Sequence, residues 1–477
     1  ASYIADRYGR LTGRPGVCAV SSGVACINAL SGLANAWFDH APMLLVSGSG
    51  PLATAGMGHF QDLDPIGPTV SLTRYSRTID RPERVVQILD EAWYHALGPD
   101  PGPVHLNFPL DVQVTEVPEE QLVWSARPAP SVILPEDSVE EIAAAFQKAT
   151  RPLIVAGGRL YHSGSATEVL RVAERWSIPV VTPIWDPGVV DQPSPVFAGV
   201  VGASTGEPLL LQEADLILVA GAEPDYRIGY LQPASLAPGA RVFHLLAGWR
   251  KLEELLEAAD LPPFTEWLKT VIARRKAFTE AVWQCGRRQA NGQIHAIHII
   301  EALQAVLDNR TILVIDGGAI GQWAHHLLCA RRYPSYWLTP GPSGAVGYGI
   351  GGAMAARLAF PDRRVILLAG DGAFTFNATD IERAIAQQLP FVAIVADDQG
   401  WGLTREGQLQ QLGATFATEL GPIAFDELAR SLGAWARRVK SPQEILPALE
   451  EALDAGTIAV IHVPVVGGIP RVIPEGE

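Results

Sequence analysis

The chain alternates short apolar runs of four to six residues with longer segments in which apolar residues recur every three or four positions. The short runs have the length of buried strands, and the longer segments have the periodicity of helices that cover a sheet. Strands that alternate with helices in this way form parallel sheets, so we expect an α/β fold. The predicted strands cover residues 16–20, 43–46, 104–108, 153–156, 180–183, 216–220, 242–246, 312–315, 365–369, 391–396 and 459–463.

Two interruptions divide this alternation into three blocks. Residues 118–136 are rich in proline and polar residues, which indicates a linker. A charged helical connector is expected at 263–292, where Asn291-Gly292 favours a change of chain direction. We therefore predict three consecutive Rossmann-like α/β domains with mainly parallel sheets, at residues 1–117, 137–262 and 293–477.

Two loops rich in glycine and acidic residues follow consecutive predicted strands of the third block. They are Gly370-Asp371-Gly372 and Asp397-Asp398-Gln399-Gly400. One helical segment, with Asn377 as its expected N-cap, joins the two strands into a βαβ unit, so both loops should lie at the same edge of the sheet. Two carboxylates beside glycines suit Mg2+ and a ligand phosphate. In the alternative interpretation, this is an ordinary α/β unit in which the acidic residues only cap helices.

Composition excludes several classes of function. The net charge of −15, without a basic cluster, argues against a nucleic-acid-binding surface. No apolar run is long enough to span a bilayer. The four cysteines form no CxxC pair, which supports neither a zinc site nor a disulfide framework. We expect them to be buried thiols of a cytoplasmic protein; they are Cys18, Cys26, Cys285 and Cys329.

Two further patterns leave alternatives open. Gly157-Gly158 and Gly221 follow predicted strands of the middle block, where a flavin or another nucleotide binds in some α/β proteins and where a plain scaffold also uses glycine. His325 and His326 follow Trp323 on a predicted helix. For this pair we favour a packed or solvated helix face over a catalytic role.

The motifs of the first and third blocks together resemble those of thiamine-diphosphate (ThDP) enzymes of the acetolactate synthase, benzaldehyde lyase and pyruvate decarboxylase type. The similarity is closest to acetolactate-synthase-like large subunits. One departure is that these enzymes usually have Asn-Asn where this chain has Asp397-Asp398. The resemblance rests on ADRYGR (5–10), RPGVC (14–18), Ser22-Gly23 with Asn28, GLANA (32–36), HFQDLD (59–64), GAVGYG (344–349), GDG (370–372) and DDQG (397–400).

This resemblance implies ThDP and Mg2+ as cofactors. Asp371 and Asp398 would be the side-chain ligands of the metal ion, and Gly400 would add its backbone carbonyl. The residues that the resemblance assigns to cofactor binding are Asn28, Gly344, Val346, Gly370, Asp371, Gly372, Ala373, Asp398 and Gly400.

The resemblance also implies residues that face the reaction. Phe60 and Gln61 would face the active centre, and Val346 would support the bent cofactor as an apolar wedge. Core packing is the alternative for Val346, and a surface amide is the alternative for Gln61. A glutamate that activates the cofactor would lie three positions before Ala1, so we expect an N-terminal part of this domain to precede the present sequence.

The activity that the resemblance implies is decarboxylation of a 2-oxo acid and its ligation to a second carbonyl, as in acetolactate synthases. An alternative of the same class is a 2-hydroxyacyl-CoA or benzaldehyde-type lyase. An alternative of another class is a catalytically silent ThDP-binding assembly or regulatory subunit. Since the superfamily's site lies between subunits, we expect a homodimer or homotetramer that acts on a small molecule, not on nucleic acid or membrane. FAD in the central block stays an open alternative.

Overall fold

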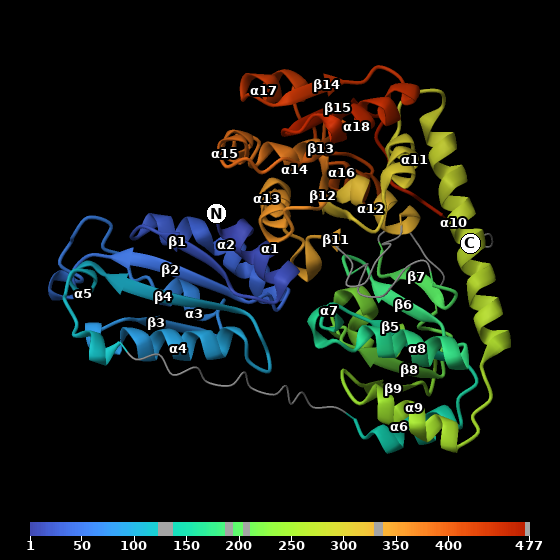
Figure 1. Cartoon of the computed structure of the whole chain (residues 1–477). Coiled ribbons are helices and arrows are strands. Elements are labelled where there is room, and N and C mark those ends of the chain that lie inside the picture. The colour runs from blue at the N-terminus through green and yellow to red at the C-terminus, as the bar shows by residue number, and fades with distance from the viewer. Residues whose placement is uncertain (123–136, 187–193, 204–209, 329–336, 473–477) are drawn as a thin grey trace. The chain divides into compact units, whose positions relative to one another are not determined.

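A computed structural model describes residues 1–122, 137–186, 194–203, 210–328 and 337–472. Contacts divide the chain into two compact units, which are drawn together in Figure 1. Unit 1 consists of Ala1–Leu134 and Pro340–Asp362, and unit 2 consists of Pro135–Thr339 and Arg363–Glu477. Most of the predicted linker at 118–136 lies outside the described residues.

Unit 1 contains a parallel sheet in the order β1-β2-β4-β3. Helices α1 and α2 pack on one face, and α4 packs on the other. The three strands predicted here are present, whereas β3 was not predicted, because its sequence YSRT has no apolar run and it lies half-buried at the sheet edge. The elements are α1 (Ser2–Thr12), β1 (Gly16–Val20), α2 (Val24–Phe38), β2 (Met43–Ser49), α3 (Gly67–Val70), β3 (Tyr75–Thr78), α4 (Val85–Ala96), β4 (Pro103–Pro109), α5 (Leu110–Gln113) and α13 (Gly349–Ala359).

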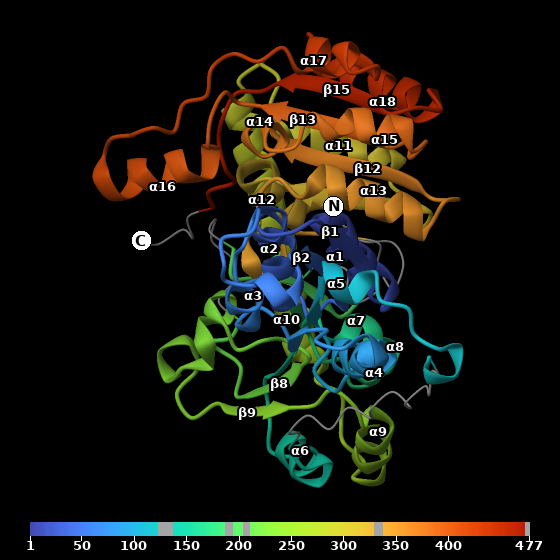
Figure 2. The ribbon, with the colours of Figure 1, turned by 90° about the vertical axis from the view of Figure 1, so that its left-hand side faces the viewer.

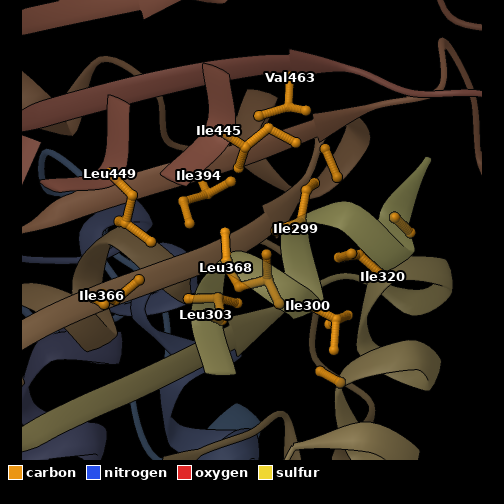
Figure 3. Packing of buried hydrophobic residues seen from close by; sticks show 14 of the residues in the cluster. Ile299, Ile300, Leu303, Ile320, Ile366, Leu368, Ile394, Ile445, Leu449 and Val463 are labelled. Atoms are coloured by element: carbon orange, nitrogen blue, oxygen red, sulfur yellow. The ribbon is translucent and has the colours of Figure 1, made fainter. Parts of the chain in front are cut away.

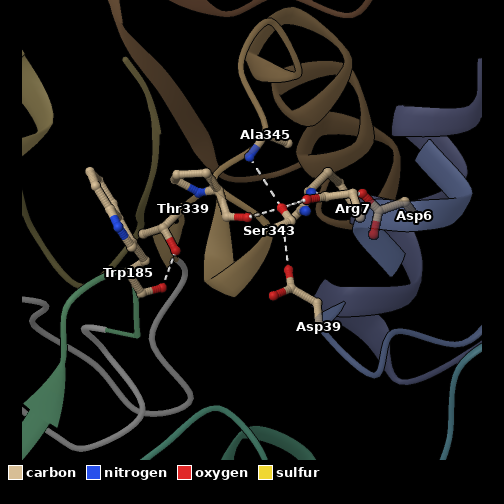
Figure 4. A network of polar contacts seen from close by, with 9 residues as sticks. Asp6, Arg7, Asp39, Trp185, Thr339, Ser343 and Ala345 are labelled. Carbon is tan, nitrogen blue, oxygen red and sulfur yellow. Dashed lines mark hydrogen bonds and ion pairs between the residues drawn. The ribbon is translucent and has the colours of Figure 1, made fainter. Parts of the chain in front are cut away.

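A buried ionic cluster ties α1 to the rest of unit 1 (Figure 4). Arg7 is 1% exposed, and its guanidinium lies 2.9 Å from the Asp6 carboxylate and 2.7 Å from that of Asp39. Asn35 donates to Asp6 over 2.6 Å, and the Arg7 guanidinium lies 4.8 Å from the centre of the Tyr348 ring. Burial raises the pKa of Asp6 to about 7, although Arg7 acts in the opposite direction. The helix is therefore held by charges that are largely shielded from water.

The first sheet of unit 2 is parallel and five-stranded, in the order β7-β6-β5-β8-β9. Helices α6, α8 and α9 pack on one face, and the start of the long helix α10 packs on the other. Strand β7 was not predicted, because Gly199 interrupts its apolar run and its pairing with β6 is irregular. The elements are α6 (Val139–Phe146), β5 (Pro152–Ala156), α7 (Leu160–Ser163), α8 (Ala166–Trp176), β6 (Val180–Pro183), β7 (Phe197–Val201), β8 (Leu216–Ala220), β9 (Arg241–His244), α9 (Trp249–Ala258) and α10 (Thr265–Ala290).

The second sheet of unit 2 is also parallel, in the order β11-β10-β12-β13-β15-β14. Apolar side chains of α11, α12 and α18 cover one face of this sheet, as Figure 3 shows. The elements are α11 (Ala296–Val306), β10 (Thr311–Asp316), α12 (Gly318–Leu327), β11 (Trp337–Leu338), β12 (Arg364–Gly370), α14 (Asp371–Thr375), α15 (Asp380–Ala386), β13 (Val392–Asp397), α16 (Gly402–Leu412), α17 (Phe425–Ser431), β14 (Trp435–Arg438), α18 (Ile445–Asp454) and β15 (Ala459–Pro464).

Two local predictions can be compared with the structure. The N-cap at Asn377 is wrong: two short helices, α14 and α15, replace the single predicted helix, and α15 begins after Thr379 without a side-chain cap. The buried state of the cysteines is confirmed for Cys18, Cys26 and Cys285, whereas Cys329 lies outside the described residues. Within the described ranges, no helix is both long and apolar enough to cross a membrane.

Replacing Arg7 by methionine tests the ionic cluster. The substitution leaves two buried carboxylates without their cation, and breaking a buried pair from one side costs about 3–5 kcal/mol. We expect the Arg7→Met protein to unfold at a clearly lower urea concentration, followed by circular dichroism. Exposed Arg14 is the matched control, and Arg14→Met should leave the midpoint nearly unchanged. Equal midpoints for both variants would contradict a stabilising role of the cluster.

Candidate cofactor site

The two acidic loops follow strands that are neighbours in the second sheet of unit 2. Strand β12 pairs with β13 in parallel, with Gly370 opposite Ala396. Asp371 is the first residue after β12, and Asp398 is the first residue after β13. The predicted βαβ arrangement is therefore present, and both loops leave the same edge of the sheet.

Asp371 joins the two loops through hydrogen bonds. Its side chain is nearly inaccessible, with one oxygen accepting the Gly372 N–H over 2.8 Å and the other accepting the Gly400 N–H over 3.0 Å. Burial, and then the negative charge of Asp398, raise the pKa of Asp371 to about 7. Two carboxylates that repel each other at a buried edge form a site that favours a cation.

Asp398 is held by an arginine that the sequence had not indicated. Its carboxylate lies 3.3 Å from the Arg405 guanidinium, which contacts the Asp398 carbonyl oxygen at the same distance. Burial raises the pKa of Asp398, while the positive charge of Arg405 acts in the opposite direction. Arg405 lies on α16, which buries none of its own residues and lies apart from α15, α17 and α18 (Figure 2).

Asp397, the residue before Asp398, contacts a buried histidine. His462 is fully buried on β15, with Nε2 2.8 Å from Asp397 and Nδ1 3.2 Å from Asp426. Burial is the largest single influence on the pKa of Asp397 and acts to raise it, but the hydrogen bond and charge of His462 and the N–H of Gln399 together bring this pKa below its usual value. The sequence signal for His462 was its place as the single polar residue within the apolar run at 459–463.

Glycines are required where the loops pass closest to their neighbours. A Cβ at Gly372 would lie 2.9–3.0 Å from the ring of Trp401, and a Cβ at Gly402 would lie 2.6 Å from the Asp398 carboxylate. The close approach expected at Gly372 is present, and within the chain Trp401 is the residue that makes it. Trp401 was not among the predicted site residues.

The predicted residues Phe60 and Gln61 lie in unit 1. Phe60 is 78% exposed and lines a pocket of about 430 Å³ at the ends of β1, β2 and β4. Gln61 has a positive φ of 55°, and its side-chain oxygen accepts a hydrogen bond from Ser22 over 3.0 Å. Gln61 is therefore anchored to the turn before α2, and a Cβ at Gly23 would come within 2.6 Å of the Gln61 carbonyl.

The other predicted residues of unit 1 lie on α2 and on the segment before α13. Asn28 is exposed on α2, and Val346 is half-buried. Gly344 is exposed with a positive φ of 62°. The predicted residues thus form two groups. Unit 1 holds Asn28, Phe60, Gln61, Gly344 and Val346, and unit 2 holds Gly370, Asp371, Gly372, Ala373, Asp398 and Gly400.

The donor set of unit 2 fits a hard cation with an open coordination sphere. Carboxylate and carbonyl oxygens are the ligands that Mg2+ takes, and this ion usually keeps waters or phosphate oxygens in its remaining positions. Across the described ranges, no group of three or more His, Cys, Asp or Glu side chains is arranged to enclose a metal ion. An ion at Asp371 and Asp398 would therefore depend on backbone, water and ligand oxygens as well.

Comparison with known proteins identifies the family. Three models of thiamine pyrophosphate enzymes match this chain: the N-terminal TPP-binding domain at residues 1–67, the central domain at 139–265 and the C-terminal TPP-binding domain at 316–463. They follow one another in the order of the predicted blocks. The chain belongs to the thiamine-diphosphate-dependent enzymes.

Curated relatives of this chain include acetolactate synthases. The acetolactate synthase isozyme 1 large subunit of Escherichia coli K12 is 27% identical over 97% of this chain and 85% of its own length. The probable acetolactate synthase large subunit of Methanocaldococcus jannaschii is 27% identical over 100% of this chain and 86% of its own length. The acetolactate synthase large subunit of Lactococcus lactis is 28% identical over 86% of this chain and 74% of its own length.

The glycines of the central domain of this ThDP enzyme have contacts within the protein. A Cβ at Gly157 would lie 2.1 Å from the Ala222 backbone, so glycine is needed for the two strand ends to approach. The Gly158 N–H donates to Asp186 over 3.3 Å, and Asp186 pairs with buried Arg227 over 3.1 Å. Close packing therefore explains the glycine at 157, and the hydrogen bond to the Asp186–Arg227 pair gives Gly158 a role in the scaffold.

The histidine pair of α12 lies inside the protein. His325 is 4% exposed, packs edge-on against Trp185 at 4.7 Å between ring centres, and has no hydrogen-bond partner among the described residues for either ring nitrogen. His326 packs against Phe278. This agrees with a packed helix face. Burial lowers the pKa of His325 to about 3.

Replacing His325 by phenylalanine should make the enzyme less sensitive to acid. The unfolded chain binds a proton at this residue below its ordinary pKa of 6.5, whereas the folded chain does not until about pH 3. Stability is therefore lost as the pH falls from 6.5. Between pH 7.5 and 5, this loss amounts to about 2 kcal/mol, and it should be absent in His325→Phe.

Urea unfolding of both proteins at the two pH values measures the difference. His325→Leu serves as a second apolar variant, because the pH-dependent part should be the same whatever the new side chain packs against. If the free energies of unfolding of variant and wild type differ by the same amount at both pH values, His325 is not the source of the acid sensitivity.

Proposed function

We propose that this ThDP enzyme is an acetolactate-synthase-like carboligase that requires Mg2+. It would decarboxylate one 2-oxo acid and ligate the remaining fragment to the carbonyl of a second. The observation that carries the metal requirement is the pair of buried carboxylates, Asp371 and Asp398, at one edge of a parallel sheet beside glycine loops. The names of relatives that cover nearly the whole chain support the type of reaction.

The loops of unit 2 would anchor the cofactor. Asp371, Asp398 and the Gly400 carbonyl would bind Mg2+, and the backbone of Gly370, Gly372 and Ala373 would hold the diphosphate. This assignment agrees with the hydrogen bond from Gly400 to Asp371, which fixes the spacing of the two loops before any ligand binds. Preorganised ligands lower the entropy cost of binding.

The residues of unit 1 would contribute to the reacting end. ThDP supplies the electron sink for breaking and making the C–C bond. Val346 would support the cofactor, with Asn28 also binding it, and the Gly344 carbonyl would accept a hydrogen bond from its amino group. Phe60 and Gln61 would face the substrate; the exposure of Phe60 beside a pocket of about 430 Å³ agrees with this role.

Three expectations from the sequence are not tested by these contacts. A homodimer or homotetramer with a shared site, a cytoplasmic location and FAD in the central domain stay predictions. The contacts of Gly157 and Gly158 favour a scaffold role at that position over a flavin contact.

Calorimetric titration with ThDP in MgCl2 tests the anchoring residues. We expect saturable binding that is lost in EDTA. Asp371→Asn should weaken it on the order of 100-fold, because a charged ligand of this kind contributes about 3 kcal/mol. The control is Asp362→Asn, an exposed acidic residue at the opposite end of β12, which should bind ThDP like the wild type. Unchanged affinity in Asp371→Asn would remove Asp371 from the metal site.

Turnover of the full-length protein with pyruvate, ThDP and MgCl2 tests the reaction type. We expect one acetolactate and one carbon dioxide from two pyruvates. Carbon dioxide without a ligation product would count against the synthase assignment. Binding of ThDP without turnover of any 2-oxo acid or acyloin would favour the silent, ThDP-binding subunit instead.

A further inference from the structure

Three carboxylates meet at the edge formed by β12 and β13. Asp397 ends β13 and Asp398 follows it, and Asp371, the first residue after the neighbouring strand β12, accepts the Gly400 N–H of the same loop. A diphosphate would bring further negative charge to the same place. A cation that already contacts one of these carboxylates therefore has a direct influence on binding.

Arg405 is the cation that contacts Asp398 among the described residues. Its guanidinium spans the carboxylate and the carbonyl oxygen of Asp398, both at 3.3 Å. The side chain of Asp398 is 10% exposed and that of Arg405 is 21% exposed. By contrast, Arg383 and Glu382 on α15 form a pair whose side chains are 60% and 50% exposed, as is usual for a surface ion pair of little consequence.

The local backbone is shaped to admit this guanidinium. A Cβ at Gly400 would lie 2.2 Å from an Arg405 nitrogen, and one at Gly467 would lie 3.6 Å from another. Gly400 is also the residue whose carbonyl is assigned to the metal ion and whose N–H donates to Asp371. Arg405 thus packs against Asp398 and Gly400, the two residues after β13 that are assigned to the metal ion.

Asp397, the residue before Asp398, is paired with a different side chain. Asp397 is paired with His462 from β15 inside the sheet layer, whereas Asp398 is paired with Arg405 from α16 at the edge. The two adjacent carboxylates therefore point to different partners. Arg405 therefore acts on Asp398 and not on Asp397.

We propose that Arg405 is a positioning residue for cofactor binding, which orients Asp398 and offsets its negative charge beside the diphosphate. This inference rests on the proposed binding of ThDP and Mg2+. Without Arg405, Asp398 would be free to turn and would add an uncompensated charge next to an anionic ligand. Both effects weaken binding, and both require that residue 398 is a carboxylate.

A double-mutant cycle measured by calorimetric titration with ThDP at saturating MgCl2 tests the proposal. We expect Arg405→Gln to weaken ThDP binding about tenfold, because an uncompensated charge next to a ligand costs roughly that factor. In the Asp398→Asn background, the same substitution should change affinity less than about threefold. Arg405→Lys keeps the charge and should recover most of the affinity. Glu419→Gln, which removes the exposed second partner of Arg405, is the matched control and should bind like the wild type.

The outcomes separate the two claims. If the wild type does not bind ThDP in MgCl2, the proposed function fails and the role of Arg405 fails with it. If the wild type binds and Arg405→Gln costs the same factor with Asp398 and with Asn at that position, Arg405 acts only through general stability, and the proposal is overturned. If Arg405→Gln does not fold, Arg405→Met takes its place in the same cycle, because methionine fills part of the volume of the arginine side chain without its charge.

Discussion

The parallel pairing of β12 with β13 is the constraint on which the candidate site depends. Its register sets Gly370 opposite Ala396, so the two chains reach the sheet edge together and turn away in adjacent loops. Asp371 then accepts an N–H from each loop, which fixes their separation. A shift of one residue in this pairing would move Asp398 to the other face of its strand and separate the carboxylates.

Once the loops are fixed, electrostatics determines what they favour. Burial and like charge raise the pKa of Asp371 to about 7, so the edge holds negative charge only with difficulty. A bound divalent cation would relieve this repulsion, and Arg405 relieves part of it at Asp398. The glycines at 400 and 402 contribute through their lack of a side chain, because any Cβ there would collide with Arg405 or Asp398.

Sequence patterns predicted most of the strands that contain a long apolar run and missed strands that are very short, polar or interrupted. Runs such as 312–315 and 365–369 are buried on both faces, so their composition alone indicates a strand. The edge strands β3 and β14 are half-buried and polar, and only pairing with a neighbour makes them strands. Asp371 and Asp398 could be predicted because each directly follows one of these largely apolar strands, whose end is visible in the sequence. Arg405 could not, because its contact with Asp398 depends on the direction in which α16 leaves the loop.

The buried charge cluster around Arg7 and the one around Asp371 differ in whether the chain supplies a cation between the carboxylates. In unit 1, Arg7 lies between Asp6 and Asp39, and Asn35 donates to the same Asp6 oxygen that Arg7 contacts, so this cluster contains its own cation. In unit 2, the partners of Asp371 are two backbone N–H groups, and its nearest charges are negative. The first arrangement is a means of holding helix α1. The second leaves a demand for positive charge that the chain meets only in part, which is the condition expected of a site that binds a metal ion together with its anionic ligand.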